Sequence, residues 1–313
     1  MWRYVARKLL ASVPVLLGAT LLAFLILRLT PGDPARLVAG EQASEDDVRV
    51  IRHQLGLDRP FAVQYLVFLG DLLKGDLGRS IRTGRPVRNE IGSRFPYTFE
   101  LALVSLVLSI GAGVAAGIVA AVRPNTLYDY GATLGALAGI STPTFWLGLL
   151  LMLAFSYYLG WLPASGRAGP LWTPDGWRSM IMPAVALGAP SAAIIARLTR
   201  SSLLEVLRQD YIRTARAKGV VQRAVIVRHA LRNAIIPVVT VVGLRLGGLL
   251  GGAVVTEQVF AWPGIGALIV TAIATRDYPV VQGAMLTTSF VFVSVNLAVD
   301  LLYAFVDPRI RYE

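Results

Sequence analysis

The chain has 313 residues, of which 55% are hydrophobic and 16% charged, and its mean hydropathy is +0.61. A water-soluble fold could not cover that much apolar surface, so the composition predicts a protein whose solvent is the lipid bilayer. The chain has no cysteine, which excludes disulfides and cysteine-ligated zinc, and its two histidines, His53 and His229, are too far apart in sequence to form a metal cluster alone. We therefore expect no cofactor and no metal site.

The formal net charge of +11 fits either a nucleic-acid partner or an anionic membrane face. The basic residues cluster beside the hydrophobic segments, which favours the membrane. We therefore expect a lipid bilayer and no nucleic acid as the surroundings of this chain.

Six apolar runs reach the roughly 20 residues that a helix needs to cross about 30 Å of hydrocarbon. They lack the alternating polarity of barrel strands, so each is predicted to be a helix. The first run has a long apolar core and is followed by Pro31-Gly32-Asp33-Pro34 rather than by a small-residue cleavage site, which favours an uncleaved span. The expected fold is an all-α, polytopic membrane protein with six transmembrane helices at about residues 9–29, 99–122, 132–160, 179–198, 234–259 and 280–305.

The distribution of basic residues predicts the orientation of these spans. With the N-terminus inside, the inner segments hold most of the basic residues that flank spans, whereas the two short outer loops hold only Arg167, Arg178 and Arg276. Both termini are therefore expected on the inner side. Four tryptophans near the outer ends of spans are typical of interfacial anchors, namely Trp161, Trp172, Trp177 and Trp262.

The long segment between the first two spans is predicted to be external and helical. Ser44 is expected to cap a short helix with acids in its first turn, which ends before Gly56. A second helix over residues 61–73 has an apolar face that needs a packing partner, formed by Phe61, Tyr65, Phe68, Leu69 and Leu72.

Glycines recur on single helical faces in several spans, which lets helix backbones approach closely. The densest set lies in the fifth span. Two alternatives stay open: packing within this chain, or a subunit interface or pore lining. The glycines concerned are Gly113 and Gly117; Gly131, Gly135 and Gly139; and Gly243, Gly247, Gly248, Gly251 and Gly252.

A basic, amphipathic segment links the fourth and fifth spans. Residues 201–218 are expected to form one helix that Gly219 ends, and a second helix is expected from about Gln222 to Asn233. The pattern by itself fits attraction to anionic lipid as well as docking of a protein. The expected apolar face consists of Leu203, Leu204, Leu207, Tyr211 and Ala215.

This segment resembles the cytoplasmic EAA loop of permease subunits of bacterial ABC importers, with matching residues at Ala215, Gly219 and Leu231. A closer resemblance, over essentially the whole chain, is to the B-type permeases of dipeptide, oligopeptide and glutathione ABC importers. Its marks are Pro31-Gly32-Asp33-Pro34, Gly75-Asp76-Leu77-Gly78, Asp210-Tyr211 with 213–219, Arg228-His229 with 231–234, Trp262-Pro263-Gly264, Arg276-Asp277-Tyr278-Pro279 and Asp307-Pro308-Arg309.

The resemblance implies a type I ABC importer permease fold in the bacterial inner membrane. It implies residues 1–30 as cytoplasmic N-terminus and first span, 31–98 as a periplasmic-side segment, and 99–313 as a five-helix core with a cytoplasmic coupling loop at about 200–233. The expected role is a transport subunit of an ATP-driven, binding-protein-dependent importer of small peptides. The residues that would couple to the ATPase are Tyr211, Arg213, Thr214, Ala215, Arg216, Lys218 and Gly219.

The resemblance also implies partners: a homologous second permease that makes a heterodimer, one or two cytoplasmic ATPase subunits, and an extracytoplasmic peptide-binding protein. ATP and Mg²⁺ would be bound by the ATPases, because this chain has no Gly-Lys-Ser/Thr phosphate loop and is expected not to be an enzyme. Alternatives are an importer of nickel or a metal chelate with the same architecture, and an ion-gradient-driven secondary carrier. The carrier would need paired mid-membrane acids, which the sequence lacks.

Arg245 lies near the middle of the fifth span, where a charge is costly unless it faces water, a partner or an acid. It is a candidate pathway residue that attracts a peptide carboxylate, and the alternative is an ion pair with a carboxylate of this chain or a partner. Glu100, Glu257 and Asp300 lie near span ends and are expected to be interfacial.

Overall fold

The computed structural model describes residues 2–29, 34–39, 43–54 and 56–306. Its regular elements there are helices, so the all-α prediction is confirmed. Two of the sequence marks, Pro31-Gly32-Asp33 and Asp307-Pro308-Arg309, lie outside the described residues. The helices are α1 (Trp2–Leu29), α2 (Pro34–Ala39), α3 (Glu45–Gln54), α4 (Phe61–Leu73), α5 (Val87–Val122), α6 (Leu127–Ser141), α7 (Thr144–Leu151), η1 (Met152–Tyr158), α8 (Pro174–Leu207), α9 (Asp210–Ala217), α10 (Gln222–Ala224), η2 (Val225–Ala230), α11 (Leu231–Ala234), α12 (Ile236–Val259), α13 (Ile265–Ala274) and α14 (Tyr278–Val306), where η marks a π-helix.

Five of the helices in the described ranges are long and apolar enough to cross a bilayer: α1, α5, α8, α12 and α14. The predicted third span is not one straight helix. It consists of α6 and the continuous α7–η1 helix, which are bent by 111° against each other at a short break. Pro143 explains the break, because it has no amide hydrogen and holds Thr142 in an extended conformation (φ −84°, ψ 123°). Counting the bent pair as one span gives the predicted six.

The chain divides into two compact units. Unit 1 comprises Met1–Pro96 with Ala267–Ser294, and unit 2 comprises Tyr97–Gly266 with Val295–Glu313. Helices α5, α13 and α14 each contribute residues to both units.

In unit 1, the predicted apolar face of α4 packs on α1. The ring of Phe24, which is 1% exposed, lies 5.1, 5.3 and 5.7 Å from the rings of Phe61, Tyr65 and Phe68. The hydroxyls of Thr20 and Tyr65 share a hydrogen bond of 2.9 Å. The first span is therefore the packing partner that the apolar face of α4 was predicted to need.

Helix α3 begins as predicted, with Ser44 as its cap. The Ser44 hydroxyl accepts a hydrogen bond from the Asp47 amide (3.2 Å) and donates one to the Asp47 carboxylate (2.6 Å). These bonds hold the pKa of the Asp47 carboxyl below its ordinary value. The chain turns after the helix at Gly56, whose φ is +63°.

Two sequence marks that lie about 200 residues apart meet in unit 1. The Asp277 carboxylate, at the turn between α13 and α14, accepts hydrogen bonds from the Ser80 hydroxyl (2.5 Å) and the Ile81 amide (3.1 Å). Asp277 is 5% exposed, and Pro279 lies beside Gly78. The loop that follows Gly75-Asp76-Leu77-Gly78 is therefore held by the Arg276-Asp277-Tyr278-Pro279 turn.

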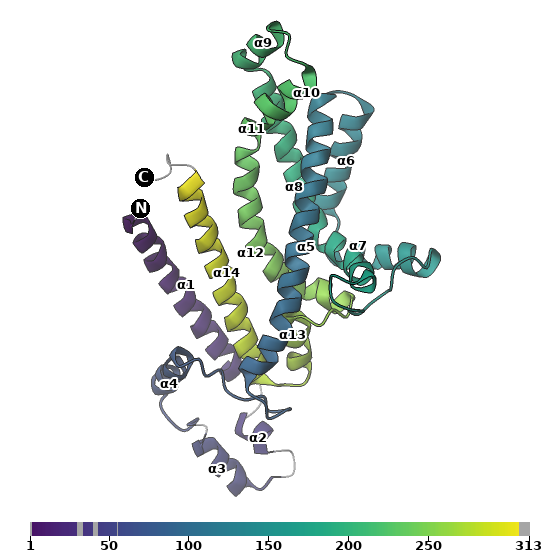
Figure 1. Ribbon diagram of the computed structural model, residues 1–313. Coiled ribbons are helices and arrows are strands. Elements are labelled where there is room, and N and C mark those ends of the chain that lie inside the picture. Colours follow the sequence, from purple (N-terminus) through teal and green to yellow (C-terminus); the bar gives the residue numbers. More distant parts are fainter. Residues whose placement is uncertain (1, 30–33, 40–42, 55, 307–313) are drawn as a thin grey trace. The chain divides into compact units, whose positions relative to one another are not determined.

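In unit 2, α5, α6 and α8 lie side by side (Figure 1). A Cβ on Gly113 or Gly117 would lie 2.6 Å from the carbonyl oxygen of Ala192 or Ala196 respectively, so these glycines let α5 and α8 touch backbone to backbone. Packing within the chain is therefore the role of the glycine pair in α5. In α12, by contrast, no described atom lies within 4 Å of where a Cβ would stand on Gly248 or Gly251.

Candidate functional site

The basic segment between α8 and α12 forms the short helical pieces α9, α10, η2 and α11 at one end of unit 2, which we call the loop end (Figure 1). The expected single helix over residues 201–218 is wrong, because α8 ends at Leu207 and α9 begins at Asp210. Gln209 is extended between them (φ −70°, ψ 148°). The second predicted helix is confirmed as α10, η2 and α11, with a π-helical middle over Val225–Ala230.

The break at Gln209 changes which side chain of α9 is buried. The predicted apolar face included Tyr211, but Tyr211 is 43% exposed and its neighbour Ile212 is fully buried. Ile212 packs in a cluster that joins the end of α5, the end of α8 and the pieces after α9. We call this cluster the anchor core; its buried members are Ala121, Leu203, Ile212, Val225, Ala230 and Ala234, and Ala215 packs against it.

A hydrogen bond also ties α9 to the helix that leads into the fifth span. The Asn233 side-chain amide donates to the Tyr211 hydroxyl at 2.8 Å. Asn233 lies in α11, and α12 begins at Ile236 directly after it. Helix α9 is thus fixed to α5 and α8 through Ile212 and to α11 through Tyr211.

The charged and polar side chains of α9 and of the turn after it are exposed. Arg213, Thr214, Arg216 and Lys218 are all exposed, and the Arg213 guanidinium lies 3.5 Å from the exposed Asp210 carboxylate. Gly219 follows with φ +78°, the left-handed conformation that ends a helix and that side chains disfavour. The helix stop predicted at Gly219 is confirmed. These residues give a short cationic surface to a well-anchored helix.

Arg245 lies in α12 and is half-buried. Within the part of the chain that the structure describes, its guanidinium makes no hydrogen bond or ion pair. An intrachain ion pair, one of the two alternatives for Arg245, is therefore not found among those residues.

The structure adds a partly buried ion pair at the loop end that the sequence reasoning did not single out. Arg200 of α8 contacts the Asp129 carboxylate of α6 through two hydrogen bonds of 2.6 and 2.8 Å, and the Asp129 side chain is 3% exposed. The amide of Asn125 donates a third bond to Asp129 at 2.9 Å. The available signal was an acid at the start of an apolar run, which demands a partner when it is buried.

Three residues expected at the membrane interface are covered by, or paired with, other parts of the chain. Glu257 and Trp262 are 0% and 1% exposed, because the chain after α12 folds back over them. Glu100 forms a two-bonded ion pair with Arg167 at 3.2 Å, and both side chains are 17% exposed. Trp161, Trp172 and Trp177 are exposed, as interfacial anchors would be.

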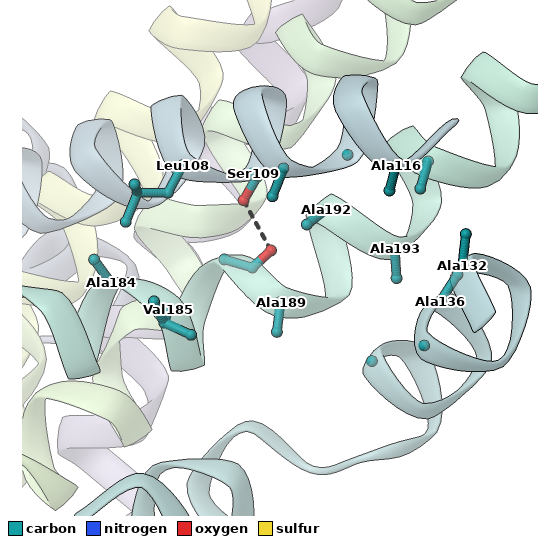
Figure 2. A pocket seen from close by; sticks show the side chains of 16 residues that line it. Leu108, Ser109, Ala116, Ala132, Ala136, Ala184, Val185, Ala189, Ala192 and Ala193 are labelled. Atoms are coloured by element: carbon teal, nitrogen blue, oxygen red, sulfur yellow. Dashed lines mark hydrogen bonds between the residues drawn. The ribbon is translucent and has the colours of Figure 1, made fainter. Parts of the chain in front are cut away.

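A cavity of about 340 Å³ opens between α5, α6 and α8 (Figure 2). Figure 2 draws the hydrogen bond from the Ser109 hydroxyl to the Gly188 carbonyl (2.8 Å), and the same hydroxyl bonds the Ser105 carbonyl at 2.6 Å. Such a lining offers packing surface and no group for chemistry. The lining residues are Leu108, Ser109, Ala112, Gly113, Ala116, Ala132, Gly135, Ala136, Gly139, Ala184, Val185, Gly188, Ala189, Ala192, Ala193 and Ala196.

These features define a class: a multi-pass helical membrane protein with a rigidly anchored cationic helix at one end of its span bundle. Residues 113–312 match the family described as binding-protein-dependent transport system inner membrane component, and residues 1–102 match the N-terminal family of the same systems. The chain belongs to this family of inner-membrane transport components.

Curated relatives match over their full length. The chain is 48% identical to the dipeptide transport system permease protein DppB of Alkalihalophilus pseudofirmus, with 100% of both chains covered. It is 47% identical to the glutathione transport system permease protein GsiC of Escherichia coli and 48% identical to that of Salmonella typhimurium, again with 100% of each chain covered. The protein is thus a permease subunit of an ABC importer, and as such works with a binding protein and ATPase subunits.

Solved structures support the fold alone. A chain of the MetNI methionine ABC transporter in inward-facing conformations is 17% identical over 69% of this chain and 96% of its own, with a TM-score of 0.56. A chain of an amino acid ABC transporter crystallised with histidines is 14% identical over 71% of this chain and 94% of its own, with a TM-score of 0.52. The type I permease fold expected from the sequence is confirmed.

Proposed function

We propose that this subunit forms half of the pathway of an ATP-driven importer of small peptides, either dipeptides, oligopeptides or glutathione. The observation that carries the proposal is the full-length match at 47–48% identity to permeases of dipeptide and glutathione transport systems. The relatives do not favour the nickel alternative. The other half of the pathway is a homologous second permease, and an extracytoplasmic peptide-binding protein delivers the cargo.

Helix α9 couples the subunit to a cytoplasmic ATPase. Its geometry supports this role, because a helix of only eight residues is held on two sides and presents a cationic face to solvent. The coupling residues are Tyr211, Arg213, Thr214, Ala215, Arg216, Lys218 and Gly219. Since α11 runs directly into α12, a displacement of α9 would tilt the fifth span.

The fifth span, α12, lines the transport pathway on this subunit's side. Its open glycines Gly248 and Gly251 leave room for the second permease or for cargo, and Arg245 lies on the same helix without a partner among the described residues. We assign Arg245 to the pathway as a group that attracts a carboxylate. We propose that both termini and α9 lie in the cytoplasm.

Reconstitution tests this proposal. The subunit is purified with the second permease, ATPases and binding protein encoded beside it, placed in liposomes, and assayed for uptake of labelled glutathione, dialanine and nickel. We expect ATP-dependent uptake of one of the two peptides and none of nickel. Uptake that an ion gradient sustains without the ATPases would contradict the proposal in favour of a secondary carrier.

Crosslinking tests the coupling surface in the same complex. An Arg216→Cys variant with a thiol-reactive photocrosslinker should capture an ATPase subunit, because Arg216 is exposed on α9. A matched variant on the other side of unit 2, Trp172→Cys, should capture none, since Trp172 is 84% exposed but lies in the loop before α8.

A further inference from the structure

Glu257 is a buried acid in the last turn of α12 that the coupling loop does not use. It is fully buried, and its carboxylate accepts a hydrogen bond of 2.6 Å from the hydroxyl of Thr98 in α5. Thr98 is itself 5% exposed, and its oxygen also accepts the amide hydrogen of Ile265 at 2.8 Å. One hydroxyl therefore joins α5, α12 and the first residue of α13.

The loop between α12 and α13 is shaped to admit this carboxylate. A Cβ on Gly264 would lie 2.1 Å from the Glu257 Oε1, and a Cβ on Gly266 would lie 2.9 Å from the Oε2 and 2.4 Å from the Val254 Cα. Any side chain at these positions would displace the carboxylate or the helix. The two glycines are thus explained by close approach to Glu257 and α12.

Further bonds hold the same loop to both helices. The Trp262 indole donates to the Tyr97 carbonyl at 2.9 Å, and the Trp262 amide donates to the Glu257 carbonyl at 2.8 Å. The Trp262 ring is 1% exposed. The start of α5 within unit 2 and the end of α12 are therefore bound to each other at the end of unit 2 opposite the loop end.

The same two helices are also joined at the loop end. Ala121, one residue before the end of α5, and Ala234, just before α12, both belong to the anchor core around Ile212 of α9. Helix α12 has 24 residues, which at 1.5 Å per residue is about 36 Å. Helices α5 and α12 thus form a frame with α9 at one end and the Thr98–Glu257 bond at the other.

We infer that Thr98 and Glu257 form a latch that makes α5 and α12 move as one body, so that displacement of α9 reaches the opposite end of the span bundle. The inference rests on the proposed coupling role of α9. Thr98 and Glu257 act as positioning residues, since neither contacts α9. Without the latch, α12 would tilt while the start of α5 and the Trp262 loop stayed in place, and ATP hydrolysis would no longer open the pathway.

The test uses the complete reconstituted complex, with uptake of labelled glutathione and dialanine measured per ATP hydrolysed. Thr98→Val keeps the shape and removes the hydroxyl, so we expect normal assembly, normal basal ATP hydrolysis and about tenfold less uptake per ATP. A tenfold loss corresponds to about 1.4 kcal/mol, the scale of one buried hydrogen bond to a charged group. Thr98→Ser restores the hydroxyl and should restore coupling.

Thr256→Val is the matched control. Thr256 precedes Glu257, is 1% exposed, and its hydroxyl has no hydrogen-bond partner among the described residues. It should remain fully coupled. Equal losses in Thr256→Val and Thr98→Val would overturn the latch, because the effect would then follow from altered packing.

Gly264→Ala is a second latch variant, which changes the loop instead of Thr98. It tests the latch if the Thr98→Val complex fails to assemble. We expect the same uncoupling, because the added methyl displaces the carboxylate. Full coupling in an assembled Thr98→Val or Gly264→Ala complex overturns the latch. The proposed function is tested separately, and ATP-driven uptake by the unsubstituted complex upholds it. Uptake without ATP in the unsubstituted complex would instead contradict the proposed function.

Discussion

Arg245 and Asp129 are charged residues within apolar helices, and they differ in whether an oppositely charged side chain compensates them. Asp129 is buried and accepts two hydrogen bonds from Arg200, so its charge is compensated inside the subunit. Arg245 is half-buried without a partner among the described residues. A charge at mid-span is costly unless water, a partner or an acid faces it. The difference fits a stabilising role for Asp129 within this subunit and motivates the proposal that Arg245 lines the pathway.

Replacing Arg245 tests that difference. Arg245→Gln keeps the size and polarity but loses the charge, so we expect the complex to assemble normally and uptake of an anionic peptide such as glutathione to fall severalfold. Arg245→Lys keeps the charge and should retain much of the uptake. The measurement is initial uptake rate per assembled complex, and an unchanged rate in Arg245→Gln would remove Arg245 from the pathway.

At the scale of elements, α9 owes its position to its neighbours. A helix of eight residues is too short to be stable alone in water. Its stability comes from Ile212 in the anchor core and from the bond between Tyr211 and Asn233. The charged side chains of Arg213, Arg216 and Lys218 stay exposed although the helix is held by Ile212 and Tyr211.

Truncating the buried anchor should loosen α9. Burial of Ile212 predicts that Ile212→Ala costs about 2–5 kcal/mol of local stability. Limited trypsin digestion should then cut faster at Arg213, Arg216 and Lys218. Val221→Ala is the matched control, since Val221 is 69% exposed and its truncation should leave the cleavage rate unchanged. Equal cleavage in the two variants would show that Ile212 does not hold the helix.

At the scale of the whole molecule, the cysteine-free sequence makes the proposed topology directly measurable. In spheroplasts, a membrane-impermeant maleimide should label a Trp172→Cys variant and spare a Lys218→Cys variant. Inside-out vesicles should give the reverse. The unsubstituted protein is the background control, and labelling of Lys218→Cys in intact spheroplasts would contradict the cytoplasmic placement of α9.

The sequence by itself determined the spans, the start of α3, the stop at Gly219 and the apolar face of α4. Each depends on residues close together in the chain: a run of apolar side chains, a capping serine, a glycine with positive φ, or a helical period. It also carried the family, because marks scattered along the chain identify a permease subunit.

Only the tertiary structure decided where the chain bends and which polar residues are buried. The apolar run through Pro143 concealed a 111° bend, although the proline itself was a local signal. Because the helix breaks at Gln209, the side chain buried in the anchor core is that of Ile212 and not that of Tyr211, which the helical period predicted. The position of Glu257 and Trp262 near a span end did not predict that their side chains are buried, which the glycines of the following loop allow because the chain folds over them. Contacts between distant segments set these burials, and local patterns do not encode them.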